Sequence, residues 1–194
     1  IHCVELVPGV LTAAKKHFKK QNRGVFADPR YRVFIQDGRT FVLSARTKYD
    51  VIMTESVHPA YQGNASLYSR DYLQHCKDRL AENGVISVWV PLYRLSLDDL
   101  KMICKTFSDV FPHATLWRAN NGHNKHVQLI ATQQALSIDF ERFRNRLQEP
   151  RIREDLARVD LENVFTMLNS HWLDEQSFRE YSRDAKTNSD NHPY

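Results

Sequence analysis

Apolar and polar positions follow two alternating periods over the first two thirds of the chain, and this predicts a repeating order of strands and helices. Short apolar runs of strand character fall at residues 1–7, 32–36, 49–54 and 85–91. A helix is predicted after each of these strands, at residues 8–22, 39–46, 69–81 and 96–110. Asn83-Gly84 predicts the C-cap and turn after the third helix, and Ser96 the N-cap of the fourth. Two strands, 114–118 and 126–132, then flank a polar turn containing Asn120-Asn121-Gly122.

This order predicts an α/β fold with a doubly wound, mostly parallel sheet that ends in an antiparallel hairpin. From residue 139 onward the pattern is helical and charged, with helices predicted at 139–147, 150–158, 161–170 and 174–181. A polar, extended tail follows from residue 185. We therefore expect a Rossmann-like nucleoside-binding domain over residues 1–135 and a helical C-terminal appendage over residues 136–194.

Glycine usage changes this picture at the N-terminus. A nucleotide-binding α/β domain normally begins with a strand and a glycine-rich turn that holds the charged part of the cofactor. The chain has six glycines, none of them in a Gly-x-Gly arrangement. Its first strand resembles the second strand of such a domain, so we expect the domain to lack its first, glycine-rich strand.

Composition narrows the function classes. A net charge of +4 is mild, and the basic residues around the first helix suit a solvated helix face better than a nucleic-acid footprint. Three distant cysteines and nine histidines show no metal-binding spacing. No apolar run approaches the roughly 18 residues that span a bilayer. These features predict a cytoplasmic protein that uses neither a metal nor a nucleic-acid partner.

The end of the third strand carries the strongest chemical signal. In open α/β sheets ligands bind outside the carboxyl ends of the strands, and here the strand runs into Glu55, Ser56 and His58. Glu55 is a candidate general base, because burial raises the pKa of a carboxylate toward neutral pH, and His58 could share a proton. Alternatively, Glu55 caps the next segment and His58 fills a loop. Further polar and aromatic groups of this loop could line a pocket: Tyr61, Gln62, Asn64 and Tyr68.

The first two strands also end in residues suited to a nucleoside. Glu5 could accept hydrogen bonds from both ribose hydroxyls, or it could favour the dipole of the following helix. Asp37 could accept a proton of the adenine amino group while Gly38 lets the backbone approach the base. The alternative for this pair is a turn and helix cap.

The order of these pieces resembles the spermidine synthase (polyamine aminopropyltransferase) family, whose members share the class I methyltransferase-like Rossmann fold. The resemblance covers about residues 1–132 and rests on segments 4–8, 28–30, 36–38 and 49–56. Within the family, the chain is most similar to spermidine synthase-like domains often fused to membrane segments. Runs that extend this similarity to nearly the whole chain are 66–72, 84–93, 106–117, 152–161 and 187–193.

The resemblance implies roles for these residues. Glu5 would bind the ribose, Asp37 and Gly38 the adenine, and Glu55 would take the catalytic acidic position. Family members have an aspartate at that position and a second aspartate where this chain has His58. Losing this carboxylate weakens the attraction for a dicationic amine. The implied cofactor-binding set is Glu5, Asp37, Gly38 and Ser56, and the implied substrate-binding set is Tyr61, Gln62 and Tyr68.

Three functions stay open from the residues, and with them whether the chain is an enzyme. The first is a spermidine synthase-like transferase that uses decarboxylated S-adenosylmethionine and an amine acceptor. The second is an S-adenosylmethionine-dependent methyltransferase with a non-polyamine substrate. The third is a non-catalytic nucleoside-binding or interaction domain. The resemblance also implies a homodimer and, in a full-length protein, membrane segments that would place the domain at the inner face of the membrane.

Overall fold

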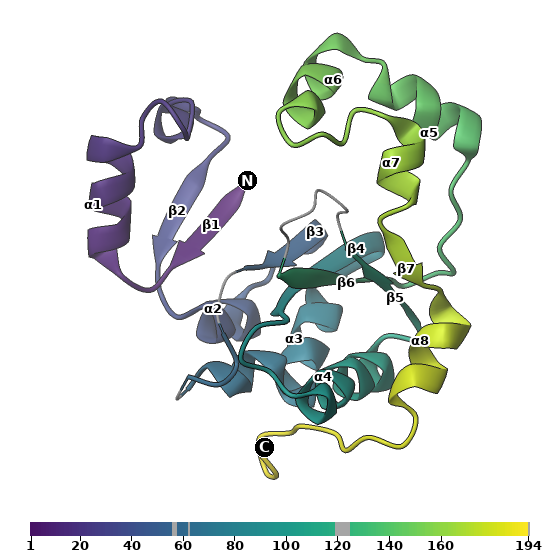
Figure 1. Ribbon diagram of the computed structural model, residues 1–194. Helices are drawn as coiled ribbons and strands as arrows, with labels where there is room; N and C mark the ends of the chain where they lie inside the picture. The colour runs from purple at the N-terminus through teal and green to yellow at the C-terminus, as the bar shows by residue number, and fades with distance from the viewer. Residues whose placement is uncertain (56–57, 62, 119–124, 194) are drawn as a thin grey trace. The chain divides into compact units, whose positions relative to one another are not determined.

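The computed structural model describes residues 1–55, 58–61, 63–118 and 125–193 (Figure 1). They divide into two compact units, residues 1–47 and residues 48–194. The fully buried apolar side chains among the described residues all belong to the second unit, from Tyr68 to Phe178. The predicted boundary after residue 135 stays a prediction.

The first unit is built on two parallel strands, β1 (His2–Glu5) and β2 (Arg32–Ile35). Its other elements are helix α1 (Pro8–His17), the 3-10 helix η1 (Val25–Ala27) and helix α2 (Gly38–Ser44). The ring of Phe34 on β2 packs against Phe41 on α2 and His2 on β1, with centroids 4.9 and 5.0 Å away.

Helix α1 is shorter than predicted. It ends at His17, whereas the pattern predicted a helix through Asn22. The Asn22 side-chain amide donates to the Ala14 carbonyl at 2.9 Å, and the chain then turns through left-handed conformations at Arg23 and Gly24. A side chain that satisfies a carbonyl of the last turn ends a helix in this way.

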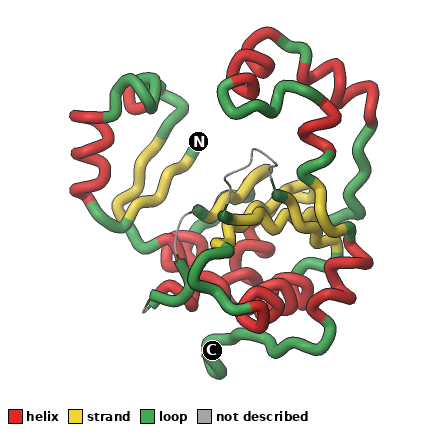
Figure 2. The backbone as a smooth tube through the Cα atoms, in the orientation of Figure 1, coloured by secondary structure: helices red, strands yellow, loops and turns green. Residues whose placement is uncertain are grey.

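The second unit contains a five-stranded sheet in the order β3-β4-β6-β5-β7 (Figure 2). Its strands are β3 (Tyr49–Thr54), β4 (Leu80–Pro91), β5 (His113–Trp117), β6 (His126–Thr132) and β7 (His171–Leu173). Strands β3 and β4 are parallel, and the pairs β4–β6, β5–β6 and β5–β7 are antiparallel. The predicted C-terminal hairpin is formed by β5 and β6. The strands were predicted to form one sheet, but in the described residues β1 and β2 form a sheet separate from the other five strands.

The helices of the second unit are η2 (Asn64–Tyr68), α3 (Arg70–Arg79), α4 (Leu97–Val110), α5 (Phe140–Leu147), α6 (Pro150–Ala157), α7 (Val164–Leu168) and α8 (Glu175–Ser182). Apart from η2, which was not predicted, they follow the predicted order, with shorter bounds except for α8, which is shifted by one residue. Ser96 caps α4 as predicted, and Asp99 completes a capping box with it. Figure 1 shows α3 and α4 on one face of the five-stranded sheet.

A cluster of aromatic rings joins α4 and α8. Phe107 of α4 packs against Phe111 and Phe178, with ring centroids 5.0 and 6.3 Å away. Phe178 of α8 and Phe111 are fully buried, and Phe107 is 1% exposed. The C-terminal helix therefore contributes to the same core as the sheet.

The helix end predicted at Asn83-Gly84 comes earlier, and the chain at these residues is an irregular part of a strand. Helix α3 ends at Arg79, and β4 begins at Leu80, so both residues lie within a strand. A Cβ at Gly84 would lie 3.0 Å from the Tyr49 carbonyl oxygen and from backbone atoms of Ala81. The register between β3 and β4 shifts here, because Tyr49 pairs with Leu80 and Val51 with Val85. The chain therefore folds tightly between Ala81 and Gly84, and a side chain at Gly84 would meet backbone atoms on both sides.

The outer side of β3 has no partner strand among the described residues, because β4 is its only neighbour in the sheet. Val51 and Met53 of this strand are 58% and 61% exposed. At the opposite edge, β7 pairs with β5. This strand was not predicted, since only three residues separate the two flanking helical patterns at that point.

Stability is expected to fall at acidic pH through Glu175. Partial burial alone would raise the pKa of its carboxyl, but hydrogen bonds from His113 and the Leu136 N–H lower that pKa below its ordinary value of 4.5. A lowered pKa in the folded state stabilises the fold above the unfolded value and is lost as pH falls through the folded value. The Tm difference between wild type and Glu175→Gln should therefore shrink between about pH 5 and pH 3. An equal difference at both ends of that range would contradict the linkage, and Glu141→Gln is the exposed control.

None of the described helices is both long and apolar enough to cross a membrane. Over the same residues, no group of three or more histidine, cysteine, aspartate or glutamate side chains is arranged to hold a metal ion.

Burial raises the pKa of the Cys76 and Cys104 thiols to about 12, which leaves both as packing residues rather than nucleophiles.

Candidate functional site

The site predicted at the end of β3 lies in the second unit. Glu55 directly follows the strand, and its side chain is exposed to solvent, so the burial that the general-base hypothesis assumed is not present. Because β3 and β4 are parallel, the segments that follow them leave the sheet at the same edge. Two predicted site residues of this region, Ser56 and Gln62, lie outside the described residues.

His58 connects the segment after β3 to the segment after β4. Its side chain is buried, and its Nε2 lies 2.8 Å from the Tyr93 carbonyl oxygen, while the Ala60 N–H donates to Nδ1 at 3.2 Å. A carbonyl only accepts and a backbone N–H only donates, so the proton of this imidazole is on Nε2. The rings of Tyr61 and Tyr93 pack against it at 5.4 and 5.2 Å.

Both ring nitrogens of His58 thus bond to backbone groups. A general base needs a lone pair directed at the substrate, and the Nδ1 lone pair is already directed at Ala60. The contacts favour the alternative interpretation, in which His58 holds its loop in place. Its backbone carbonyl does the same, because it accepts hydrogen bonds from the Tyr61 N–H and the Asn64 side chain.

Tyr68 anchors the far end of this loop. Its side chain is 3% exposed, and its hydroxyl donates to the Trp89 carbonyl of β4 at 2.9 Å. Burial raises the pKa of this phenol well above its ordinary value of 10.0. Tyr68 therefore fixes the end of the loop to β4 and does not donate a proton to a substrate at neutral pH.

A pocket of about 360 Å³ lies between this loop and α4. Tyr61 and Tyr68, two of the three predicted substrate-binding residues, both line it. Across from them are Leu95, Met102 and Ile103, with the carboxylate of Asp99 as the one acidic group of the lining. Apolar walls and a single carboxylate suit a hydrocarbon chain that carries a cationic end.

The nucleoside-binding candidates lie in the first unit, where β1 and β2 end at the same edge. Glu5 pairs with Ile35, and the Gln36 N–H donates to the Glu5 carbonyl at 3.1 Å. The Glu5 carboxylate accepts the Val7 N–H at 2.8 Å, and the Asp37 carboxylate accepts the Thr40 N–H at 2.8 Å as the N-cap of α2. The Asp37 contact is the helix cap of the alternative interpretation, whereas Glu5 bonds to the residue that precedes α1.

Gly38 follows Asp37 as the first residue of α2. Neither backbone conformation nor packing within the protein requires a glycine at this position. A Cβ at this position would meet no atom within 4 Å, and its φ lies outside the left-handed region. Open space beside a helix N-terminus lets a flat ligand approach the backbone closely.

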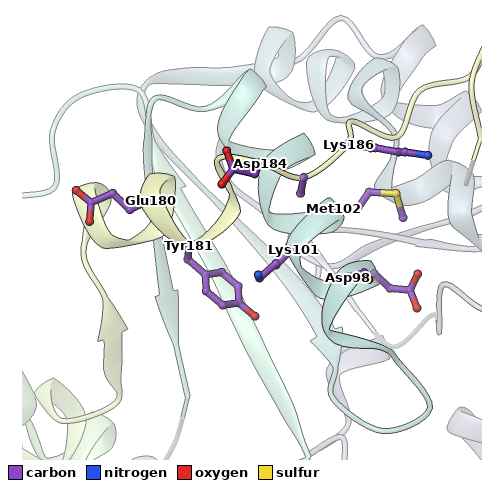
Figure 3. Close-up of a pocket in the computed structure, with 9 residues that line it drawn as sticks. Asp98, Lys101, Met102, Glu180, Tyr181, Asp184 and Lys186 are labelled. Atoms are coloured by element: carbon purple, nitrogen blue, oxygen red, sulfur yellow. The ribbon is translucent and has the colours of Figure 1, made fainter.

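A larger pocket of about 490 Å³ lies between α4, α8 and the residues after α8 (Figure 3). Lys101 lies over the ring of Tyr181 there, with its Nζ 5.7 Å from the centroid. None of the predicted site residues lines this pocket. Asp99 and Met102 line both pockets, and sequence reasoning missed both as site residues because α4 showed only the pattern of a capped, amphipathic helix.

Solved structures of known proteins share the fold of this chain. A spermidine synthase in complex with the transition-state analogue AdoDATO superposes with a TM-score of 0.73 at 22% identity, over 94% of this chain and 60% of that one. Human methyltransferase-like protein 13 in complex with SAH gives a TM-score of 0.55 at 20% identity, over 99% of this chain and 75% of that one. The protein therefore has the α/β fold of the class I methyltransferase-like proteins, as predicted.

Sequence comparison assigns the family. Residues 1–120 match the model of the spermine/spermidine synthase domain. The chain belongs to this family, which confirms the resemblance. A polyamine aminopropyltransferase of Buchnera aphidicola (subspecies Schizaphis graminum) is 24% identical over 173 residues, which cover 89% of this chain and 60% of the relative. The chain thus spans about three fifths of that relative's length.

Proposed function

We propose that this chain is the transferase domain of an aminopropyltransferase that moves an aminopropyl group from decarboxylated S-adenosylmethionine to an amine acceptor. The observation that carries the proposal is the end of β3, where Glu55 precedes a loop that encloses a pocket suited to an alkyl amine. The relative is named for this activity, and the structural neighbour binds a transition-state analogue.

Glu55 is the proposed general base. The acceptor nitrogen must lose a proton to attack the carbon bonded to sulfur, and a carboxylate at the end of β3 is the group proposed to receive it. In this step the new C–N bond forms as the C–S bond breaks, and its electron pair stays on sulfur to give a neutral thioether. The other proposed roles are nucleoside binding by Glu5, Asp37, Gly38 and Ser56, and acceptor binding by Tyr61, Gln62 and Tyr68. His58 is proposed as a positioning residue of the loop.

Methyl transfer from S-adenosylmethionine is the second candidate. It is favoured by the backbone-bonded imidazole of His58, because the acceptor region then lacks the negative charge of a second carboxylate at that position. Less negative charge reduces the preference for a dicationic acceptor. The two functions share the nucleoside contacts and differ in the group transferred.

Titration calorimetry and turnover assays on the full-length protein separate these functions. Binding of methylthioadenosine together with aminopropyl transfer to putrescine supports the proposal. Nucleoside binding without transfer to putrescine favours the methyltransferase, and no nucleoside binding excludes both enzymes. The proposed location is the cytoplasm, and the proposed assembly is a homodimer, with membrane segments elsewhere in a full-length protein.

Gly38→Ala is expected to weaken nucleoside binding while leaving the fold intact. The added methyl group meets no atom of the chain and suits a helix, so Tm should be unchanged or slightly higher. The same methyl group would occupy the space proposed for the adenine edge and lower the affinity for methylthioadenosine, on the order of tenfold. Calorimetry measures the affinity, and Gly9→Ala in α1 is the matched control. An unchanged affinity would remove Gly38 from the proposed site.

A further inference from the structure

The closing segment of the chain contacts the same loop that the site is built on. The segment 187–193 lies beyond the residues that match the family model and has no role in the proposed function. Figure 2 shows it as a loop that follows α8. Asn188 of this segment is 4% exposed and lines the pocket beneath the loop.

Asn188 bonds to three different elements of the second unit. Its side-chain amide donates to the Ala65 carbonyl of η2 at 3.0 Å. Its backbone N–H donates to the hydroxyl of Thr106 on α4 at 2.9 Å, and its carbonyl accepts the Arg70 N–H at the start of α3 at 2.9 Å. The first of these contacts depends on the side chain, and the other two do not.

Each backbone contact satisfies a group that would otherwise be costly to bury. The Arg70 N–H is one of the unpaired donors of a helix N-terminus. Thr106 is fully buried, and its hydroxyl donates to the Met102 carbonyl and accepts from Asn188. These contacts fix the Asn188 backbone, so its amide is held in place before it meets the loop.

The flanking residues extend the same attachment. The Thr187 hydroxyl donates to the Asp109 carboxylate of α4, and the Asp190 N–H donates to the Asp71 carboxylate of α3 at 3.0 Å. Asn188 therefore lies at the centre of a segment fixed to both helices. The Ala65 carbonyl, which accepts the Asn188 amide, belongs to the same loop and lies between the anchors His58 and Tyr68 in sequence.

We propose that Asn188 is a positioning residue for acceptor binding: its amide holds the 58–68 loop over α4 and so maintains the shape of the pocket. This inference rests on the proposed function for its link to the acceptor. It places a determinant of the acceptor site about 120 residues from the loop in sequence, at the end of the chain.

Hydrogen exchange tests the positioning role without any assumption about the reaction. Asn188→Asp keeps the size of the side chain and both backbone contacts but directs an acceptor at the Ala65 carbonyl, and Asn188→Ala removes the donor. In the full chain, amide exchange in residues 58–68 should rise about tenfold in both variants, as expected for one lost buried hydrogen bond. Asn163→Ala, which removes the N-cap of α7, is the matched control and should leave this exchange unchanged.

Turnover tests the link to the acceptor. With decarboxylated S-adenosylmethionine and putrescine, the acceptor KM should rise about tenfold in Asn188→Asp, while the KM for the nucleoside stays within about twofold. Unchanged loop exchange in both Asn188 variants, or a rise no different from that in Asn163→Ala, would overturn the positioning role. Faster loop exchange with an unchanged acceptor KM would overturn the link to the acceptor. A wild-type protein without transferase activity would refute the proposed function alone, because the exchange result still decides the placement of the loop.

Discussion

Replacing Glu55 with glutamine should abolish aminopropyl transfer while leaving nucleoside affinity unchanged. The substitution keeps the size of the side chain and removes the group proposed to take the amine proton. Loss of a general base typically costs about 10²–10⁴-fold in rate. The side chain is exposed, so the fold should be unaffected. Single-turnover rates with putrescine measure the chemical step, and calorimetry with methylthioadenosine measures the affinity.

The control is Glu82→Gln, an exposed glutamate on β4 near the amino end of that strand, which should leave the rate unchanged. The pH profile adds a second test, since the acidic limb of the rate should be lost together with Glu55. Transfer by Glu55→Gln at the wild-type rate would remove Glu55 from its proposed role and leave proximity as the main contribution at this site.

Phe178→Ala is expected to have the largest effect on stability. The side chain is fully buried and packs against Phe107, and truncating a buried phenylalanine costs about 3–5 kcal/mol. In a chain of this size such a loss lowers Tm on the order of 10 °C. Calorimetric or circular-dichroism melting measures the shift.

Phe165→Ala is the matched control, because the same substitution is made at a side chain that is 64% exposed. Its effect should lie within about 0.5 kcal/mol. A shift as small at Phe178 would mean that α8 is not part of the core. Residues 136–194 would then behave as the separable appendage that the sequence predicts.

Local patterns predicted most of the fold. Tyr49–Thr54 and His126–Thr132 are strands with the predicted bounds, because a short apolar run between polar turns carries its own signal. The helix after Ser96 could also be predicted, because its N-cap residue and acidic first turn are local signals. The helix end predicted at Asn83-Gly84 was wrong, because α3 ends at Arg79 and the tight contacts of Gly84 with Ala81 and Tyr49 lie within an irregular strand.

Site prediction had a different limit. The end of β3 could be predicted, since a carboxylate after an apolar strand is a local signal. The contacts of His58 with Tyr93 and of Asn188 with Ala65 join positions 35 and 123 residues apart, and no period in the sequence connects them. Their roles follow from which backbone groups the fold leaves beside each side chain. Asp99 could not be predicted as a pocket residue either. Its position in the sequence is fully explained by the capping box with Ser96, so nothing in the pattern indicates that it also lines a pocket.

The unpaired side of β3 affects how this chain behaves in solution. An edge strand presents a row of backbone donors and acceptors that can pair with another chain, and natural proteins usually protect such edges with charged residues, proline or a covering segment. Here the edge carries Val51 and Met53, both more than half exposed. Apolar side chains beside open backbone groups favour intermolecular β-pairing, so this strand is an aggregation hazard of the isolated 194-residue polypeptide.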